Sequence, residues 1–537
     1  MKTINVLDCT LRDGGYVNNW EFGNGNIKLM LRNLTDANVD IIECGFLSNK
    51  NASYDKDKSI FDSIERFQEV IPEKRHNSKY VCMINYGEYD IRDIPDFDES
   101  SIDGIRVVFH KSEVDEALEF CSELKKKGYL LFIQPMATIN YTDEELLRIV
   151  DSVNKIQPFA FYIVDSFGVM KKHDLLRMFF LIDNNLEKNI DIGYHSHNNL
   201  QLAYSNAQAL VEINSTRNRI VDTSVFGMGR GAGNLNTELF IQYLNENFVM
   251  KYNVFPLLQI IDQTLSKIYS VNYWGYSLPH YLSAIHNCHP NYASYLSEKN
   301  TLTVKAIQEI LFEIPYQRRS SFNKAYIEDL YTNYQRRIID DRGSLQFLNS
   351  KLYGQNILLI VPGNSIKSNN DLISNFIDSN NVITLSVNFI PSNFNCDFTF
   401  ISNKKRYEKL MEIVEKKSEK FIITSNIDTE ISNQVLINYS SLLNLNDAVS
   451  DNATLMLLKL LVKIGASKVY IAGFDGYSVD TLQNYVDKEM VINANTSRVD
   501  ELNTSIAKVV NEISGEINLE FLTPSKYADI INKKEGK

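Results

Sequence analysis

The segment LDCTLRDGGYVNNW, Leu7 to Trp20, begins as a buried strand and ends on charged and polar residues. Arg12 and Asp13 follow the apolar stretch, and two glycines, Gly14 and Gly15, stand directly behind them. An acid, a base and flexible backbone at a strand end suit charge stabilisation or metal binding, but a salt-bridged turn has the same composition. Other residues of the chain are needed to distinguish a functional site from a salt-bridged turn.

A second chemical signal is the pair His195 and His197 in GYHSHNN. Because side chains two apart on a strand point to the same face, both imidazoles are expected to project together. Two imidazole nitrogens and the carboxylate of Asp13 would form a divalent-metal site with positions left open for a substrate. Taken alone, an H-x-H pair is often a hydrogen-bonded feature of a core or loop, so the interpretation depends on both signals occurring at strand ends.

Further polar residues stand where other apolar runs end, and in a barrel of parallel strands this edge carries the active site. The last strand of the first half runs into GMGRGAGNLNTE, Gly227 to Glu238, whose four glycines would let backbone amides approach a ligand closely. A flexible loop is the alternative. The other strand-end residues are Glu43, Asn85, His110, Gln134 and Asp165.

The scaffold for these residues is a series of short, near-continuous apolar runs, which are typical of parallel strands covered on both faces. Segments of helical period lie between most of them; one carries a capping box at Thr142 and Glu145, and another ends on Gly128. Alternating strands and helices predict an α/β fold, a TIM (β/α)8 barrel over residues 1–240, with a doubly wound sheet as the alternative. The runs begin at Ile4, Val39, Lys79, Gly104, Tyr129, Ala160, Ile190 and Arg219.

The second half of the chain has a different pattern. Residues 241–345 lose the strand signal and are helical and aromatic, which predicts a helical appendage beside the barrel. A new strand begins with NILLIVPGNSI at Asn356, and further apolar runs alternate with helices such as DNATLMLLKLLVKIG. This pattern predicts a Rossmann-like domain with an open parallel sheet over residues 355–537.

Composition excludes several classes of function. The net charge of −12 argues against nucleic acid or an anionic membrane as a main partner. Six scattered cysteines without a CxxC pair indicate reduced thiols and a cytoplasmic protein. The N-terminus reads as a strand rather than a signal peptide, and no run of about 18 apolar residues indicates a membrane span. We also expect a homo-oligomer.

Three motifs in order carry a resemblance to a known family: TLRDGG at Thr10, GYHSHNNLQLA at Gly193 and GMGRGAGN at Gly227. Together they resemble the DRE-TIM metallolyases, the HMGL-like superfamily, over roughly residues 1–300. Within it the sequence is most similar to the 4-hydroxy-2-oxovalerate aldolases. The resemblance implies a metal-dependent aldolase that acts on a 2-oxo acid and an aldehyde through a pyruvate-type enolate.

The resemblance also implies roles for individual residues. The metal would be Mn²⁺ first, with Mg²⁺, Co²⁺ or Zn²⁺ also compatible with mixed nitrogen and oxygen ligands. Glu43 occupies the place of an acid near the metal in several relatives, and we predict that it binds substrate together with Gln134 and Asp165. The implied metal ligands are Asp13, His195, His197 and Asn234, and Arg12 is the group that stabilises the enolate.

One position departs from the aldolase pattern. In those enzymes a histidine follows the RDG triplet by one residue, and here Tyr16 occupies that position. A tyrosine with a pKa of about 10 is a poor base unless its surroundings shift it. Another group or a metal-bound water could then act as the base, and the predicted acid/base candidates are Tyr16, His110 and Tyr281.

Two other interpretations of the first half stay open. The glycine loop lacks the cysteine of the HMG-CoA lyase branch but also resembles that of isopropylmalate synthase, so a Claisen-type condensation of an acyl-CoA with a 2-oxo acid is one alternative. A non-catalytic assembly protein that kept the barrel is the other.

In the second half, Gly363, Asn364 and Ser365 form a strand-to-helix turn that suits a phosphate, although a plain turn has the same sequence. Together with Asn388 and Asp475 this turn weakly resembles small bacterial sialyltransferases and related surface-glycan transferase domains. No histidine occurs in residues 440–537, so we expect binding of a nucleotide or nucleotide sugar without transfer. Such a fusion suggests a link to surface-polysaccharide or sugar biosynthesis.

Overall fold

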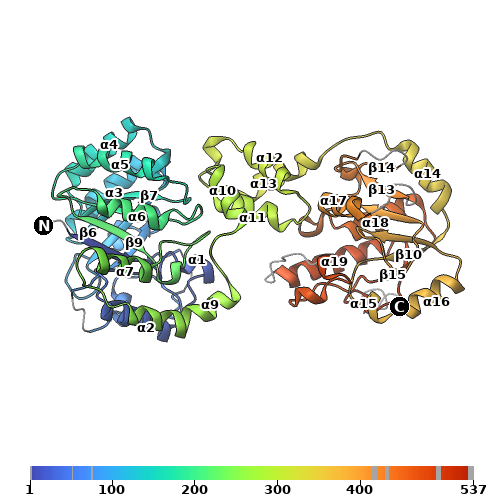
Figure 1. The fold of residues 1–537 in the computed structure, drawn as a ribbon, viewed down its shortest axis with the longest axis horizontal. Helices are drawn as coiled ribbons and strands as arrows, with labels where there is room; N and C mark the ends of the chain where they lie inside the picture. The colour runs from blue at the N-terminus through green and yellow to red at the C-terminus, as the bar shows by residue number, and fades with distance from the viewer. Residues whose placement is uncertain are drawn as a thin grey trace. The chain divides into compact units, whose positions relative to one another are not determined.

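The computed structural model describes residues 3–50, 53–73, 77–413, 420–429, 434–490 and 498–529. The chain divides into two compact units, which are described separately (Figure 1). The first comprises residues 1–293 and 315–322, and the second comprises residues 294–314 and 323–537. The helical segment predicted as an appendage is thus divided between the two units.

The first unit is built around a closed barrel of eight parallel strands, as the sequence predicts. β1 pairs with both β9 and β2, and this closure excludes the doubly wound alternative. A short additional strand, β3, pairs with β2. The strands are β1 (Ile4–Asp8), β2 (Ile41–Leu47), β3 (Ile60–Phe61), β4 (Lys79–Asn85), β5 (Gly104–Phe109), β6 (Leu130–Pro135), β7 (Ala160–Asp165), β8 (Asp191–Ser196) and β9 (Arg219–Thr223).

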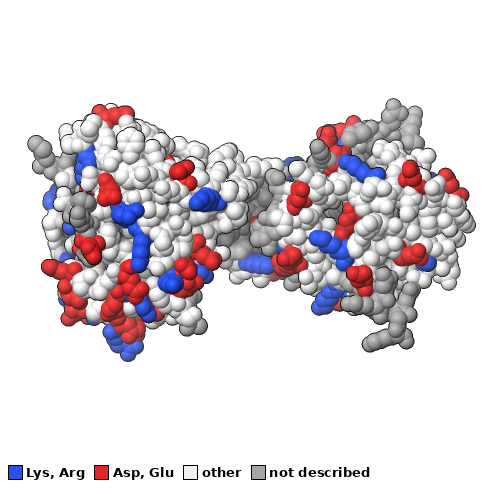
Figure 2. Space-filling model, turned by 90° about the horizontal axis from the view of Figure 1, so that it is seen from below, with Lys and Arg blue, Asp and Glu red and all other residues white. Residues whose placement is uncertain are grey.

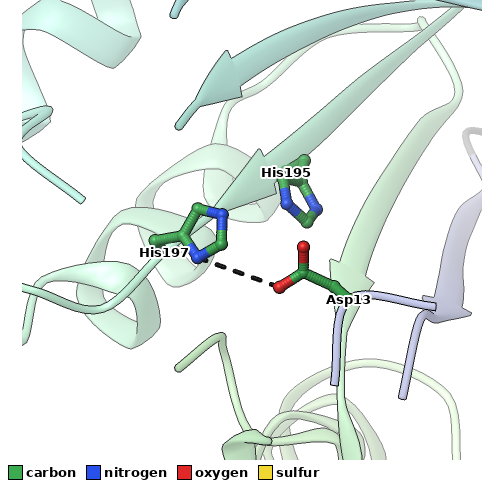
Figure 3. A group of neighbouring side chains, drawn as sticks. All are labelled: Asp13, His195 and His197. Carbon is green, nitrogen blue, oxygen red and sulfur yellow. Dashed lines mark ion pairs between the residues drawn. The ribbon is translucent and has the colours of Figure 1, made fainter. Parts of the chain in front are cut away.

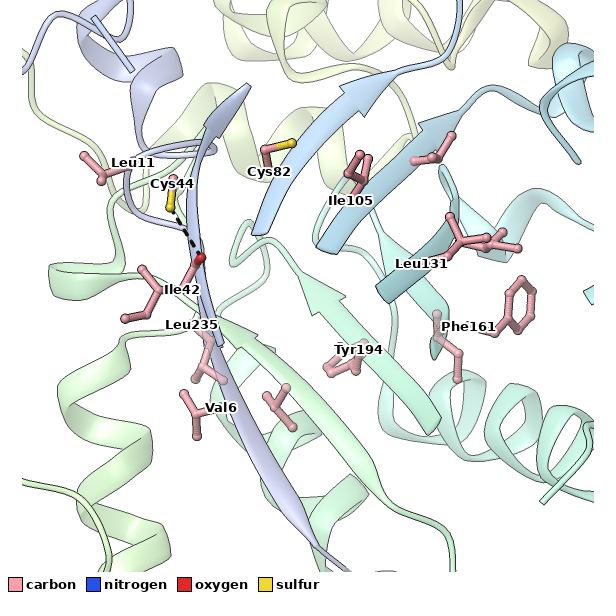
Figure 4. Close-up of a cluster of buried hydrophobic side chains, with 14 of the residues drawn as sticks. Val6, Leu11, Ile42, Cys44, Cys82, Ile105, Leu131, Phe161, Tyr194 and Leu235 are labelled. Atoms are coloured by element: carbon pink, nitrogen blue, oxygen red, sulfur yellow. Dashed lines mark hydrogen bonds between the residues drawn. The ribbon is translucent and has the colours of Figure 1, made fainter. Parts of the chain in front are cut away.

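The barrel strands are apolar on both faces because each face has its own core. Ile41 and Val81 belong to the cluster inside the barrel. The next residues along the chain, Ile42 and Cys82, point the other way into the larger cluster that the strands share with the helices (Figure 4). This alternation with period two explains why the strands read as continuous apolar runs.

The helices of the first unit begin and end on the predicted signals. Thr142 and Glu145 form the capping box of α4: the Glu145 amide donates to Thr142 Oγ1 at 3.2 Å, and the Thr142 amide donates to Glu145 Oε2 at 2.7 Å. The helices are α1 (Gly15–Asn18), α2 (Asn24–Asp36), α3 (Val114–Lys126), α4 (Asp143–Ile156), α5 (Lys172–Asn185), α6 (Ala203–Glu212) and α7 (Thr237–Asn247). Short 3-10 turns are η1 (Glu65–Glu69), η2 (Ile91–Asp93), η3 (Lys111–Glu113), η4 (Thr138–Asn140) and η5 (Val225–Gly227).

The segment between the two sheets is helical, as its aromatic, strand-free sequence indicates. A π-helical turn, η6 (Ile261–Leu265), joins its first two helices. The helices are α8 (Phe255–Ile260), α9 (Ser266–Val271), α10 (Leu278–Ile285), α11 (Pro290–Glu298), α12 (Val304–Phe312), α13 (Lys324–Gln335) and α14 (Arg342–Leu352), with the 3-10 turn η7 (Tyr316–Arg318).

The second unit contains an open parallel sheet, also as predicted. Its strand order is β14-β13-β12-β11-β10-β15-β16, so the chain moves outward from β10 in one direction and later returns to the other side of β10. The sequence patterns missed the two edge strands, because β14 has three residues and β16 alternates polar and apolar residues instead of forming an apolar run. The strands are β10 (Asn356–Ile360), β11 (Ile383–Val387), β12 (Phe398–Ile401), β13 (Phe421–Thr424), β14 (Val435–Ile437), β15 (Lys468–Ala472) and β16 (Asn518–Phe521).

The helix α18 of this unit is buried on most of its surface. It begins at Asn452, whose side chain accepts the Leu455 amide at 3.2 Å, and ends on Gly465 in the left-handed conformation. The helices that accompany the sheet are α15 (Ser365–Ser368), α16 (Asn370–Ser379), α17 (Lys404–Ile413), α18 (Ala453–Ile464) and α19 (Val499–Ile513). The 3-10 turns are η8 (Tyr439–Ser441), η9 (Asp447–Val449), η10 (Thr481–Gln483) and η11 (Lys488–Met490).

The surface carries charges of both signs. Acidic and basic side chains are interspersed over the face of the molecule drawn in Figure 2. Within the described ranges, the helices are all too short or too polar to cross a membrane.

One glycine inside the barrel is required by close packing. A Cβ atom on Gly193 would lie 2.2 Å from the ring of Tyr162. Tyr162 is fully buried, and its hydroxyl donates to Asp222 Oδ1 at 3.0 Å. The missing side chain at Gly193 therefore makes room for the ring that contacts Asp222.

We predict that Gly193→Ala lowers the free energy of unfolding by about 1–3 kcal/mol, the usual cost of overpacking a core. Gly25→Ala in α2 is the matched control, because a Cβ there meets no atom within 4 Å. The control should be neutral or stabilising by about 0.4–1 kcal/mol. Urea unfolding of both variants tests this, and equal stability would show that the contact with Tyr162 is not tight.

Candidate active site

Asp13, His195 and His197 come together at the carboxyl end of the barrel (Figure 3). Asp13 lies in the turn after β1, His195 is on β8, and His197 directly follows that strand. One potential ligand atom from each lies within 4.8 Å of the others, and all three side chains are buried. The predicted juxtaposition is therefore present, and its donors are those that bind divalent metals.

The protonation states of this group suit metal binding. Burial opposes ionisation of Asp13, but the neighbouring His197 and Arg12 outweigh it and hold the pKa of this carboxyl well below its usual range. Burial lowers the pKa of His197 to about 3. A carboxylate and a neutral imidazole are the forms that bind a metal.

Each histidine is oriented by a hydrogen bond on Nδ1. His195 Nδ1 lies 3.0 Å from Asp222 Oδ2, and His197 Nδ1 lies 3.2 Å from the carbonyl oxygen of Arg230. Such partners fix the ring and leave Nε2 available to a metal. The sequence interpretation missed Asp222, although an acid within the apolar strand RIVDT was a signal that it has a buried partner.

Arg12 is held in place by two carboxylates. Its Nη1 donates to Asp13 Oδ1 at 2.7 Å, and its Nε donates to Glu43 Oε2 at 2.8 Å. Burial disfavours its charge, but Glu43 and Asp13 outweigh this and raise the pKa of Arg12. Its Nη2 is buried without a hydrogen-bond partner among the described residues. One donor of a fixed guanidinium is therefore left for a ligand.

Arg106, on β5, extends this contact across the barrel interior. Its Nη1 lies 2.8 Å from Glu43 Oε1, and its Nη2 forms an ion pair with Asp222. Its guanidinium also lies 5.0 Å from the centre of the Tyr162 ring. Because Asp222 contacts His195, charged side chains connect one predicted metal ligand to another. An arginine within the run GIRVVF was the sequence signal for this residue, and it was missed.

The glycine-rich loop packs directly on Asp13. Asn234 Nδ2 donates to Asp13 Oδ2 at 2.7 Å, and a Cβ on Gly229 would lie 2.3 Å from that nitrogen. The Arg230 amide also approaches Asp13 Oδ2, at 3.4 Å. Asn234 Oδ1 is buried without a described partner. For Asn234 to be a metal ligand, as predicted, this amide oxygen has to face the ion; that role stays a prediction.

The predicted substrate-binding residues occupy different surroundings. Glu43 lies between the two arginines described above. Gln134 lies against Arg106, and with its amide oxygen toward the guanidinium it accepts hydrogen bonds at 2.5 and 2.7 Å. Asp165 accepts the amides of Val169 and Met170 at 3.0 and 2.9 Å, and burial raises its pKa to about 6. Direct substrate contacts of all three stay predictions.

The acid/base candidates do not take part in the hydrogen bonds around Asp13, His195 and His197. Tyr16 is 39% exposed and packs on Trp20. Partial burial against its neighbours raises the pKa of Tyr16. This direction makes Tyr16 a weaker base than an ordinary tyrosine. His110 and Tyr281 are exposed, and in the described part of the chain neither side chain bonds to the metal group. Their catalytic roles stay predictions.

A further histidine, His289, approaches the loops of the barrel. Its ring lies 6.4 Å from that of Phe167, which follows β7, and stacks on Phe322 at 6.1 Å. Burial, with the nearby Arg230 and His110, lowers its pKa to about 3. The histidine-rich stretch HYLSAIHNCH was the signal that could have identified it.

In the second unit, the predicted nucleotide-binding residues gather at the carboxyl edge of the sheet. Gly363, Asn388 and Asp475 line one cavity of about 340 Å³. Asn364 precedes α15 and Ser365 begins it, next to Gly363. Their ligand-binding roles stay predictions.

Comparison with known proteins covers mainly the first unit. Residues 3–260 match the family model HMGL-like. A 4-hydroxy-2-oxovalerate aldolase of Geobacillus genomosp. 3 is 26% identical over 247 residues, which are 45% of this chain and 71% of the relative. An enzyme of the same name from Bacillus thuringiensis (strain Al Hakam) is 23% identical over 279 residues, 50% of this chain and 78% of the relative.

Among solved structures, the N-terminal domain of a putative aldolase from Bacteroides vulgatus is 23% identical, with a TM-score of 0.47 over 54% of this chain and 96% of that chain. The predicted family and the family match agree on the same part of the chain, and the barrel and its buried strand-end residues lie within it. Residues 3–260 therefore form a domain of the HMGL-like family.

Proposed function

We propose that the barrel is a divalent-metal-dependent aldolase that makes or breaks the carbon–carbon bond next to a 2-oxo acid. The observation that carries this proposal is the buried group of Asp13, His195 and His197 with the fixed guanidinium of Arg12 against it. The relatives named 4-hydroxy-2-oxovalerate aldolase support a 2-oxo acid and an aldehyde as the substrate classes.

The residues fit a divalent cation. The buried carboxylates of Asp13, Glu43 and Asp222 carry one more charge than the guanidiniums of Arg12 and Arg106 that pair with them. A divalent metal changes this net negative charge into a net positive charge. The carboxylate of a bound 2-oxo acid then makes the site neutral. Asp13, His195 and His197 would hold the metal, with Mn²⁺ as our first choice among ions that accept mixed nitrogen and oxygen ligands.

When bound, the metal supplies Lewis-acid polarisation of the 2-oxo group. Arg12 provides the second stabilising charge. Its free Nη2 can donate to the substrate oxygen on which negative charge develops as the neighbouring bond breaks. Because Glu43 and Asp13 fix the guanidinium, and because arginine keeps its proton, this donor is positioned before the reaction.

The proton on the hydroxyl of the aldol substrate needs a separate acceptor. Tyr16 takes the chain position of the aldolase histidine, but its raised pKa disfavours it as a base. Its ring lies 5.6 Å from the Arg230 guanidinium, so it can shape the aldehyde pocket beside the glycine loop. His110 and Tyr281 stay in the proposal as alternative proton acceptors.

The enzymatic test is exchange of the methyl protons of pyruvate with deuterated solvent, catalysed by the full chain with Mn²⁺. Aldol chemistry requires this enolisation, and NMR measures it directly. Consumption of an acyl-CoA with a 2-oxo acid would favour the Claisen alternative. Absence of exchange and of oxaloacetate decarboxylation would leave the barrel as a binding protein and overturn the proposal.

We predict that His195→Ala and His197→Ala each abolish stoichiometric binding of Mn²⁺, because each removes one of three buried donors. His173→Ala is the control, since His173 is an exposed histidine of the same unit. Metal content after dialysis, measured by atomic emission, checks the prediction. A variant that folds and retains one metal per chain would contradict the ligand assignment.

We predict that Arg12→Lys lowers the rate of pyruvate enolisation about 100-fold or more, with a smaller effect on pyruvate binding. Lysine keeps the charge but cannot contact Asp13, Glu43 and substrate with one planar fork. Arg66→Lys is the control, because the ion pairs of Arg66 with Asp62 and Glu69 lie on the surface. A near-normal rate for Arg12→Lys would assign enolate stabilisation to another group.

A further inference from the structure

The cavity of the second unit lies where parallel α/β sheets bind ligands. It is lined by residues that follow β10, β11 and β15, among them Gly363, Asn388 and Asp475. The chain leaves β10 toward β11 on one side and reaches β15 on the other, so the loops diverge at this point. Ligands of open parallel sheets bind at the carboxyl edge beside such a reversal.

Part of the helical segment forms another wall of the same cavity. Tyr295, Lys299 and Asn300 line it. Asn403, the residue before α17, donates from Nδ2 to the Asn300 carbonyl at 3.0 Å. Residues 294–314 belong to the second unit. The cavity is therefore lined both by loops that follow the strands of the sheet and by residues that precede the sheet in the sequence.

The cations on the lining differ in their partners. Lys299 is paired with Glu328 at 2.7 Å, and Arg498 with Glu501 at 3.1 Å. Arg406, at the start of α17, is half-buried and Lys324 is exposed, and neither has a carboxylate within ion-pair distance among the described residues. It donates to the Met490 carbonyl and lies 5.6 Å from the centre of the Tyr485 ring. Burial accordingly lowers the pKa of Arg406.

The strand-to-helix turn at residues 363–365 lies against a negatively charged group instead of a cation. Asp475 Oδ2 accepts the Ser365 amide at 2.7 Å, and a Cβ on Gly363 would lie 2.7 Å from the Asp475 carboxyl. A phosphate at this turn, where the sequence suggests it, would face that carboxylate. Asp475 can instead accept hydrogen bonds from hydroxyl groups, and Arg406 is a half-buried cation on the lining with which an anion can pair.

Aromatic rings and amides supply the remaining lining. Tyr477, Tyr485 and Tyr527 are on it, and Asn388 adds an amide group. Flat rings stack on tyrosines, and amides read the polar edges of such rings. The lining thus combines an unpaired guanidinium, a hydroxyl acceptor and aromatic surface.

We propose that this cavity binds a nucleotide, free or joined to a sugar, with its phosphate on Arg406, its ribose hydroxyls toward Asp475 and its base against the tyrosines. This inference does not rest on the proposed aldolase function, because all of its residues belong to the second unit.

The test is calorimetry on the full chain with the mono- and diphosphates of cytidine, uridine and thymidine. Ribose 5-phosphate and inorganic phosphate separate the contributions of ring, sugar and anion. At least one nucleotide should bind about 10-fold or more tightly than ribose 5-phosphate, because stacking of the base adds to the phosphate contact. Absence of nucleotide binding, or equal affinity for inorganic phosphate, would overturn the proposal.

The variant Arg406→Gln should bind that nucleotide about 10-fold or more weakly, since it removes a charge-assisted hydrogen bond. Arg342→Gln is the matched control, because Arg342 pairs with Asp340 on the surface away from the cavity. Pyruvate exchange should be unchanged in both variants.

Arg406→Lys is a second variant that keeps the charge and loses the planar fork; it should bind with intermediate affinity. Wild-type affinity in both folded Arg406 variants would contradict the assignment. Nucleotide binding that is lost in His195→Ala would place the ligand in the barrel and also overturn the proposal.

Discussion

The active-site end of the barrel depends on a buried series of alternating charges. Each member contacts the next within hydrogen-bond or ion-pair distance, and the series begins and ends on residues of the candidate metal site. Removing one partner from such a pair leaves an uncompensated buried charge, at a cost of about 3–5 kcal/mol. The series runs Asp13, Arg12, Glu43, Arg106, Asp222 and His195.

This arrangement ties the geometry of the candidate site to barrel closure. β1 carries the Arg12 turn and hydrogen-bonds to both β2, which supplies Glu43, and β9, which supplies Asp222. Arg106 reaches from β5 across the interior to both carboxylates. The ligand geometry therefore forms only when distant strands have closed into a barrel. Specificity of the closed state, rather than net stability, is what buried pairs of this kind provide in some proteins.

Arg106 in the first unit and Arg406 in the second differ in how their positive charges are compensated. Arg106 is fully buried and compensated by Glu43 and Asp222, so it positions other residues. Arg406 is half-buried, donates to the Met490 carbonyl and contacts the Tyr485 side chain, and in the described part of the chain no carboxylate lies within ion-pair distance, so we infer that its charge can bind a ligand. The difference follows from the positions of carboxylates: β2 and β9 place Glu43 and Asp222 against Arg106 across the barrel interior, whereas no described carboxylate lies within ion-pair distance of Arg406.

The sequence by itself determined the eight barrel strands, the five inner strands of the second sheet, the cap of α4 and the family. These depend on local signals: apolar runs, the Thr142–Glu145 box and the H-x-H pair with the RDGG turn. It did not determine the partners of those residues. Arg106 and Asp222 are 116 residues apart, and Ser365 and Asp475 are 110 apart, so periodicity carries no information about either pair. The edge strands β14 and β16 were missed because β14 has three residues and β16, NLEF, alternates polar and apolar residues instead of forming an apolar run. Only the tertiary structure decided which charges are neutralised, because pairing depends on distances across the fold rather than along the chain.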